Sequence, residues 1–319
     1  MVYSPLRYSP FKRYPNNPII RREDIPYTCN TVFNAAACKY KGEYILLLRV
    51  EDLYGKSHFT IARSKDGINF EISDKPWITS SSDPEFEPYE RYGIEDPRIT
   101  PIDGKYYITY SAFGPYGVRI GIGVTEDFIS FKRISLATEV DNKDGVLFPE
   151  KIKGKYAMIT RPSGGISRRG DMWISFSPDL IYWGEAKVLM FFSPGMWGNQ
   201  KVGASVPPIK TDKGWLVIFH GVKNTSSGSI YRVGALLLDL KDPTKIKGFT
   251  QHYILGPEEL YERIGDTPNV VFPCGAVLEE NGELKLYYGV ADTAIALATA
   301  DINEIIYLCE KCEDVPKQP

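Results

Sequence analysis

Short runs of apolar and aromatic residues recur five times along the chain. Each recurrence begins with two such runs around a glycine turn, at 35–50, 97–113, 147–163, 205–222 and 272–292. It continues with a second pair around a short, mostly acidic turn, at 58–72, 119–134, 171–184, 231–246 and 294–306. The turn glycines Gly42, Gly104, Gly154, Gly214 and Gly282 are 62, 50, 60 and 68 residues apart. Repetition at such a period is typical of an array of similar units.

Each repeat has the strand content of one propeller blade. The runs are rich in β-branched and aromatic residues, and Asp66-Gly67, Asp103-Gly104 and Asn281-Gly282 suit tight hairpin turns. We therefore predict an all-β fold, a five-bladed β-propeller with four-stranded antiparallel blades. Residues 1–319 would form a single catalytic domain, closed or covered by the N-terminal segment and the C-terminal tail.

Few segments depart from this strand pattern. Short helices are expected at 256–265 and near 301–311. The Pro- and Ser-rich stretch 72–93 and the loop 191–200 are interpreted as insertions, the first able to fold over the mouth of the ring. Strands at the inner edge of each blade meet near one axis, so functional residues are expected there.

Composition excludes several classes of protein. The net charge is −2, which gives no basic excess for nucleic acid. No run of 18 apolar residues suggests a membrane span, and the N-terminus lacks the apolar segment of a signal peptide. Five cysteines and three histidines form no convincing metal motif, Cys309 and Cys312 being a single isolated pair. We expect a cytoplasmic protein without a metal or cofactor; a homo-oligomer is compatible with the sequence.

Polar residues cluster at the ends of strands expected near the axis. These are Asn34, Arg49, Glu95, Asp96, Arg98, Arg161, Lys201, His220, Tyr231 and Asp292. Each can be a solvated strand end, but their recurrence at similar places in the repeats favours a shared site.

The charges of these residues indicate the chemistry. Arg49, Arg161 and Lys201 come from three repeats and would face one another in a ring, which is costly unless an anion lies between them. Phosphate suits this role, because Arg and Lys both bind oxyanions. Glu95 and Asp96 are neighbours, so one of them should face the channel. A single carboxyl with several cations favours phosphate as a nucleophile over the two-carboxyl arrangement of an inverting glycosidase.

Several motifs together resemble glycoside hydrolase family 130, the β-mannoside phosphorylases and related β-mannosidases. They are GIEDPRIT (93–100), GVLFPEKIKGKYAMITRPS (145–163), KVGASVPPI (201–209), WLVIFHGV (215–222), YRVGALLLDLKDP (231–243), PNVVFPCGAV (268–277) and YYGVADT (287–293). The resemblance covers roughly residues 14–300. It implies a five-bladed propeller and an inverting phosphorolysis that releases α-D-mannose 1-phosphate.

The resemblance also implies roles for individual residues. Asp96 would be the general acid, passing its proton through the 3-hydroxyl of the mannosyl unit. Phosphate, a co-substrate, would be held by Arg49, Arg161, Lys201, His220 and Tyr231. Mannoside binding would fall to Asn34, Asp292, Glu95 and Arg98, with Arg98 supporting the acid.

The GIEDPR motif resembles the branch that acts on β-1,2-mannobiose and β-1,2-mannooligosaccharides. Glu95, which precedes the acid, should affect the acceptor side. The alternatives are a phosphorylase for β-1,4-linked mannosyl-glucose or mannooligosaccharides, a β-mannosidase that uses water, and a propeller that only binds glycans.

Overall fold

Antiparallel hairpins make up most of the chain, as the recurring apolar runs predict. The structure, a computed structural model, describes residues 9–163, 170–191 and 196–311. All five predicted turn glycines have positive φ, between 78° and 157°, a conformation that favours glycine. The glycine spacing therefore marked the hairpins correctly.

The strands fall into five antiparallel groups, which are numbered here in chain order. The first contains β3 (Thr31–Tyr40), β4 (Glu43–Glu51), β5 (Ser57–Ser64) and β6 (Glu71–Ile72). The second contains β7 (Gly93–Ile102), β8 (Lys105–Gly114), β9 (Gly117–Thr125) and β10 (Lys132–Leu136). A single parallel pairing, Ser57 with Gly93, joins these two groups into one sheet.

The other three groups are separate sheets. The third contains β11 (Asn142–Leu147), β12 (Tyr156–Pro162), β13 (Met172–Ser177) and β14 (Gly184–Met190). The fourth contains β15 (Lys201–Ala204), β16 (Ile209–Lys210), β17 (Trp215–Thr225), β18 (Gly228–Leu238) and β19 (Ile246–Phe249). The fifth contains β20 (Val271–Leu278), β21 (Glu283–Val290) and β22 (Ala294–Asp301), with β1 (Lys12–Arg13) and β2 (Ile20–Arg21) on β22.

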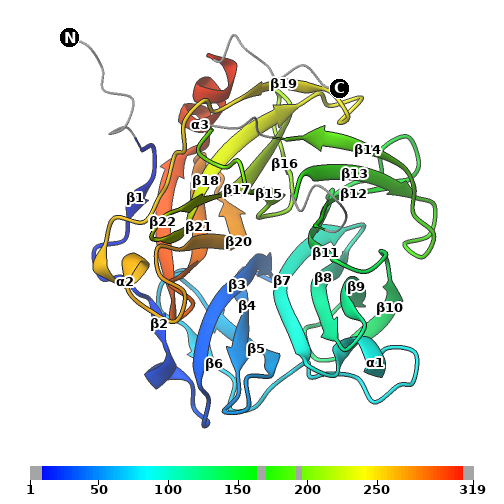
Figure 1. Cartoon of the computed structure of the whole chain (residues 1–319), viewed down its shortest axis with the longest axis vertical. Helices are drawn as coiled ribbons and strands as arrows, with labels where there is room; N and C mark the ends of the chain where they lie inside the picture. The colour runs from blue at the N-terminus through cyan, green and yellow to red at the C-terminus, as the bar shows by residue number, and fades with distance from the viewer. Residues whose placement is uncertain (1–8, 164–169, 192–195, 312–319) are drawn as a thin grey trace.

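Figure 1 shows the groups arranged around a central region, with β3, β7, β11, β15 and β20 nearest to it. Alternation of side chains along each strand explains the arrangement. Leu46 and Leu48 of β4 pack with residues of the fifth group, whereas Ile45 and Leu47 pack with the second. Corresponding apolar clusters lie between the second and third, third and fourth, and fourth and fifth groups. Each group is therefore apolar on both faces and packs against two neighbours.

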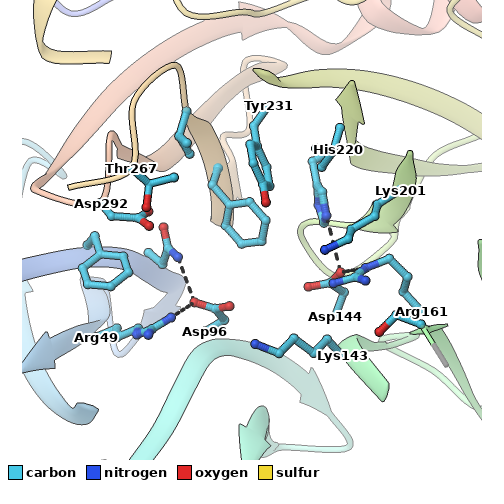
Figure 2. Close-up of a pocket in the computed structure, with 16 residues that line it drawn as sticks. Arg49, Asp96, Lys143, Asp144, Arg161, Lys201, His220, Tyr231, Thr267 and Asp292 are labelled. Atoms are coloured by element: carbon cyan, nitrogen blue, oxygen red, sulfur yellow. Dashed lines mark hydrogen bonds and ion pairs between the residues drawn. The ribbon is translucent and has the colours of Figure 1, made fainter. Parts of the chain in front are cut away.

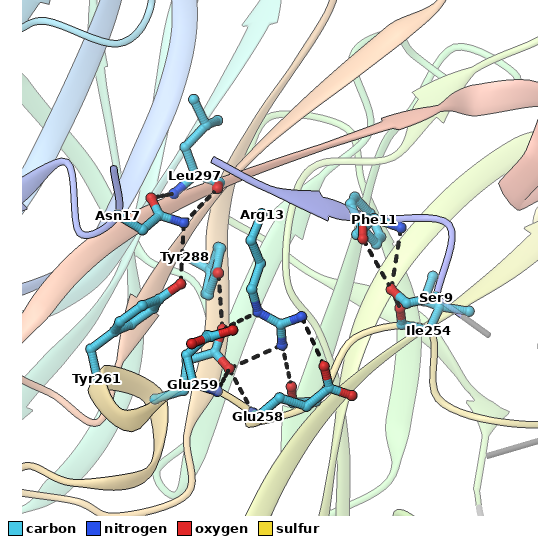
Figure 3. Close-up of polar contacts among 12 residues, drawn as sticks. Ser9, Phe11, Arg13, Asn17, Ile254, Glu258, Glu259, Tyr261, Tyr288 and Leu297 are labelled. Atoms are coloured by element: carbon cyan, nitrogen blue, oxygen red, sulfur yellow. Dashed lines mark hydrogen bonds and ion pairs between the residues drawn. The ribbon is translucent and has the colours of Figure 1, made fainter. Parts of the chain in front are cut away.

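The N-terminal segment adds strands to the fifth group, as expected if this segment closes the domain. Lys12 in β1 pairs with Thr299 in β22. The Arg13 guanidinium donates from Nε to Glu262 Oε1 at 2.8 Å and from Nη1 to Glu258 at 3.1 Å. Figure 3 shows Arg13 beside Tyr288 and Glu258. Glu262 is fully buried and also accepts from the Tyr288 hydroxyl, so this contact fixes the N-terminal segment to the last group.

Helices are few and short. Two of them, α2 (Leu260–Arg263) and α3 (Ile302–Glu310), fall where they are expected, whereas η1 (Arg22–Asp24) and α1 (Glu87–Glu90) lie where no helix is expected. Cys309 is buried in α3, and Cys312 lies outside the described residues. Among the described residues, no helix is both long and apolar enough to cross a membrane.

The two expected insertions have different outcomes. No residue of the segment 72–93 lines the central cavity. The segment instead packs against β5, where the Trp77 backbone donates to Phe59, and against the loop between β9 and β10, where the Trp77 ring contacts Phe128 and Phe131. The expectation that it folds over the mouth is therefore wrong, because its aromatic and apolar residues are used between the first two groups. The expectation for 191–200 falls partly on residues 192–195, outside the described part of the chain.

Candidate active site

A cavity of about 290 Å³ lies where the first strands of the groups converge. Its lining residues come from all five groups, and Figure 2 shows their side chains pointing toward one another. Eight of the ten predicted site residues line it: Asn34, Arg49, Asp96, Arg161, Lys201, His220, Tyr231 and Asp292. The prediction that strand ends from separate repeats meet at one site is confirmed for these eight.

Three of the lining residues are presented by equivalent irregularities in their strands. The pairing register shifts between Phe33 and Ala36 in β3, between Glu95 and Arg98 in β7, and between Lys143 and Val146 in β11. The residues at these bulges, Asn34, Asp96 and Asp144, have φ of 49°, 48° and 58°. A bulge redirects a side chain out of the regular alternation, and bulges are frequent beside active sites. Here each bulge places a polar side chain at the centre.

Asp96 is buried and tightly held. Its Oδ1 accepts from Asn34 Nδ2 and from Arg49 Nη1, both at 2.8 Å. Burial by itself raises the pKa of Asp96, but the charges of Arg49, Arg98 and Lys143 and the hydrogen bond from Asn34 outweigh it and hold the pKa at about 2. Asp96 is therefore a carboxylate at neutral pH before substrate binds.

The other two predicted residues, Glu95 and Arg98, do not line the cavity. Glu95 accepts from Arg49 Nη2 and from Lys143 Nζ, both at 3.0 Å. Arg98 is buried and donates from Nη1 to the backbone carbonyl of Asp96 at 2.8 Å. Arg98 thus supports the strand that carries Asp96, while the structure gives neither residue a direct place in the cavity.

A second carboxylate, Asp144, lies among the cations on the other side of the cavity. Its Oδ2 accepts from Arg161 Nε at 2.5 Å and lies 3.4 Å from His220 Nε2. The second nitrogen of His220, Nδ1, lies 3.2 Å from the Ser205 hydroxyl. Burial lowers the pKa of His220, so the ring is neutral near pH 7. Both ring nitrogens already have protein partners.

The remaining predicted residues provide polar groups opposite these charges. Burial raises the pKa of Tyr231, which keeps its hydroxyl protonated at neutral pH. Burial also raises the pKa of Asp292, although the Thr267 hydroxyl and the charge of Arg49 oppose that rise. Figure 2 shows Thr267 and Asp292 together, beside the end of the cavity that contains Asp96 and Arg49.

Sequence reasoning missed several lining residues, notably Lys143, Asp144, Thr267, Phe33 and Phe272. The position of a residue within its repeat could have indicated the bulges. Asn34 and Asp96 each precede the turn glycine of their repeat by eight residues. Asp144 precedes Gly154 by ten, and its Lys-Asp-Gly sequence is typical of a turn. No comparable signal marked Thr267.

The charges of the cavity suit an anion and a neutral, hydroxyl-rich ligand. Four lining side chains are cations (Arg49, Lys143, Arg161 and Lys201) and three are carboxylates (Asp96, Asp144 and Asp292). The expectation of a single carboxyl among several cations is corrected, because Asp144 and Asp292 line the cavity as well as Asp96. Asp144 binds Arg161, and Glu95 and Asp96 bind Arg49. The described residues contain no group of His, Cys, Asp or Glu side chains that could hold a metal ion.

Comparison with known proteins identifies the family to which the chain belongs. Residues 10–311 match glycoside hydrolase family 130, described as beta-1,4-mannooligosaccharide phosphorylase. The chain belongs to this family.

Its relatives differ in linkage. A beta-1,4-mannooligosaccharide phosphorylase of Ruminococcus albus is 37% identical over 92% of this chain and 89% of its own length. A 1,2-beta-oligomannan phosphorylase of Thermoanaerobacter sp. is 38% identical over 92% and 98%. The structure of a beta-1,2-mannobiose phosphorylase from Listeria innocua, in complex with beta-1,2-mannobiose, superimposes with a TM-score of 0.85 at 33% identity, covering 94% of this chain and 99% of that one.

Proposed function

We propose that this enzyme is an inverting β-mannoside phosphorylase that cleaves β-1,2-mannobiose or β-1,2-mannooligosaccharides with inorganic phosphate. The products are α-D-mannose 1-phosphate and the shortened acceptor. One observation carries the proposal: a buried carboxylate, Asp96, shares a cavity with cations from separate strand groups, among them Arg49, Arg161 and Lys201. Phosphate bound by the cations attacks C1 of the mannosyl unit, while Asp96 supplies the proton to the leaving oxygen.

The residues divide between the two substrates. Arg161, Lys201 and Tyr231 bind phosphate together with Arg49, and His220 stands beside them. Asn34 and Asp292 bind mannosyl hydroxyls, since both lie near the Asp96 end of the cavity. The Asn34 side-chain nitrogen donates to Asp96 at 2.8 Å, which places this amide next to the proposed acid.

Asp96 must gain a proton before it can act as an acid. With a pKa of about 2 it is ionised in the free enzyme, mainly because Arg49 and Arg98 oppose the effect of burial. A phosphate anion beside Arg49 competes for that guanidinium and adds a negative charge close to Asp96. Both effects raise the pKa of Asp96, so phosphate binding itself favours the acid form.

The linkage proposal rests on the motif GIEDPR and on relatives named for β-1,2 linkages at 34% to 38% identity. Glu95, bound to Arg49 and Lys143, lies just behind the cavity, where it can affect the acceptor. We also propose that the five strand groups are the blades of one propeller formed by residues 1–319. The apolar clusters between successive groups, including the first and fifth, support this closure.

The test compares β-1,2- and β-1,4-mannobiose with and without phosphate. Turnover of the β-1,2 substrate only when phosphate is present, with α-D-mannose 1-phosphate identified by NMR, is the expected result. Preference for the β-1,4 substrate overturns the linkage, and equal release of free mannose without phosphate overturns phosphorolysis.

A β-mannosidase is the second candidate because Asp292 offers another carboxylate in the cavity. Water as the nucleophile needs a base, and burial raises the pKa of Asp292 toward a basic role. Loss of phosphate-independent turnover in Asp292→Asn, with mannoside binding retained, would favour this candidate.

A further inference from the structure

Asp144 is a buried carboxylate that the proposed reaction does not use. Its side chain is 1% exposed and faces three basic side chains from three other strands. Arg161 Nε on β12 is 2.5 Å away, Arg98 Nη2 on β7 is 3.2 Å away and His220 Nε2 on β17 is 3.4 Å away. Burying a carboxylate costs free energy unless ion pairs and hydrogen bonds compensate for the lost hydration. The presence of Asp144 among these basic side chains therefore requires an explanation.

The contact with Arg161 determines which of its nitrogens remain free. Asp144 binds Arg161 through Nε, and within the described residues both terminal nitrogens of this guanidinium have no hydrogen-bond partner. The Lys201 ammonium group likewise has no hydrogen bond or ion pair with the described residues, although the Lys201 backbone is paired in β15. Figure 2 shows Arg161 and Lys201 on the same side of the cavity, next to Asp144. Two cations with unused donors therefore lie next to one fixed anion.

Electrostatics explains why that anion matters before phosphate binds. Burial and the charges of Arg161 and Lys143 lower the pKa of Lys201, whereas Asp144 raises it. The neutral His220 ring and the Tyr231 hydroxyl add no charge on the facing strands. Without Asp144, Arg161 and Lys201 would repel each other more strongly, and Lys201 would lose its proton more easily.

We propose that Asp144 is a positioning residue for phosphate: it holds Arg161 with its terminal nitrogens free and keeps Arg161 and Lys201 together as cations in the empty site. The inference rests on the proposed function, since it concerns the same phosphate site. Close packing around the carboxylate agrees with it. A Cβ at Gly203 would lie 2.5 Å from Asp144 Oδ2 and 2.9 Å from His220 Cε1, so only glycine fits there.

The change Asp144→Asn tests this directly. An amide has one acceptor oxygen for three donors, so its NH₂ group must face at least one of them. Phosphate binding is measured by calorimetry with inorganic phosphate and no mannoside, at pH 7 and pH 9. We expect at least tenfold weaker binding at pH 7 and a larger further loss at pH 9 than in the unchanged protein. A role in stability alone would not alter this pH dependence.

Two further variants keep the test decisive. Gly203→Ala displaces Asp144 without changing charge and should also weaken phosphate binding, even if Asp144→Asn does not fold. Glu90→Gln is the matched control, because Glu90 is an equally buried carboxylate that binds Arg133 and Tyr110 away from the cavity. It should lower stability and leave phosphate affinity unchanged.

The outcomes separate this inference from the proposed function. If the unchanged protein binds phosphate and Asp144→Asn binds it equally or more tightly, the positioning role is overturned and phosphorolysis stands. If the unchanged protein neither binds phosphate nor needs it for turnover, the proposed function fails, and the inference fails with it.

Discussion

Replacing Arg49 with alanine should change both phosphate binding and the protonation of the acid. The guanidinium donates to Asp96 at 2.8 Å, to Glu95 at 3.0 Å and to the Ser57 hydroxyl at 2.9 Å. It also lies over the Phe33 ring, 4.4 Å from its centroid. In Arg49→Ala, Asp96 keeps Asn34 as a donor but loses its nearest positive charge.

The structure allows both effects to be given a size. A pKa lowered from 3.8 to about 2 corresponds to about 2.5 kcal/mol in favour of the Asp96 carboxylate. Arg49 is the foremost of the groups that oppose burial, so its loss should raise the pKa of Asp96. A charge-assisted hydrogen bond contributes roughly 1.5–3 kcal/mol. Because Arg49 gives up protein partners to bind phosphate, we expect the lower value, about a tenfold rise in the phosphate KM.

Two assays check these expectations. Phosphate KM is measured at saturating mannoside, and the Asp96 carboxyl is followed by ¹³C NMR as a function of pH, with Asp96→Asn used for assignment. The carboxyl should titrate at a higher pH in Arg49→Ala than in the unchanged protein. Arg63→Ala is the control, because Arg63 is on the neighbouring strand and pairs loosely with Glu43 at 3.7 Å. An unchanged phosphate KM with an unchanged titration of Asp96 would refute the reasoning.

Three further predictions concern the acid, the N-terminal segment and pH. Asp96→Asn should lower kcat by at least about 10²-fold while mannoside affinity stays within tenfold, because the amide oxygen can still accept hydrogen bonds; loss of affinity with retained turnover would exclude the acid role. Arg13→Ala leaves Glu262 buried without its cation and should cost about 3–5 kcal/mol in urea unfolding, whereas the exposed Lys12→Ala should cost little; equal effects would contradict the contact. Acidification from pH 7 to pH 5 should lower the free energy of unfolding, because burial lowers the pKa of His220 and the unfolded chain then binds more protons; a gain in stability toward pH 5 would be inconsistent with this.

Local patterns predicted the strands well, because each run of residues carries its own structural preference. Gly42, Gly104 and Gly282 marked tight turns, since positive φ is easy only for glycine. The alternation within β4 also follows from sequence, because Ile45 and Leu47 face one neighbouring group while Leu46 and Leu48 face the other. These features depend on residues close together in the chain.

The geometry of the site depends on bulges that no local pattern specified. Asp144 stands in a Lys-Asp-Gly sequence that normally indicates a turn, yet it is a buried strand residue with φ of 58°. Its burial is possible only because Arg98, Arg161 and His220 arrive from other strands. Charge pairing between strands far apart in the sequence therefore determines the position of Asp144, which the local sequence does not predict.

Isotope labelling of the nucleophile tests most directly whether phosphate attacks the sugar. The enzyme is incubated with β-1,2-mannobiose and phosphate carrying ¹⁸O at all four positions, in unlabelled water, and the products are analysed by mass spectrometry and NMR. Phosphorolysis predicts α-D-mannose 1-phosphate that retains all four labelled oxygens, since the new C1–O bond uses a phosphate oxygen. Hydrolysis instead releases two mannose molecules for each mannobiose consumed, so this mannose yield with no labelled sugar phosphate would contradict phosphorolysis.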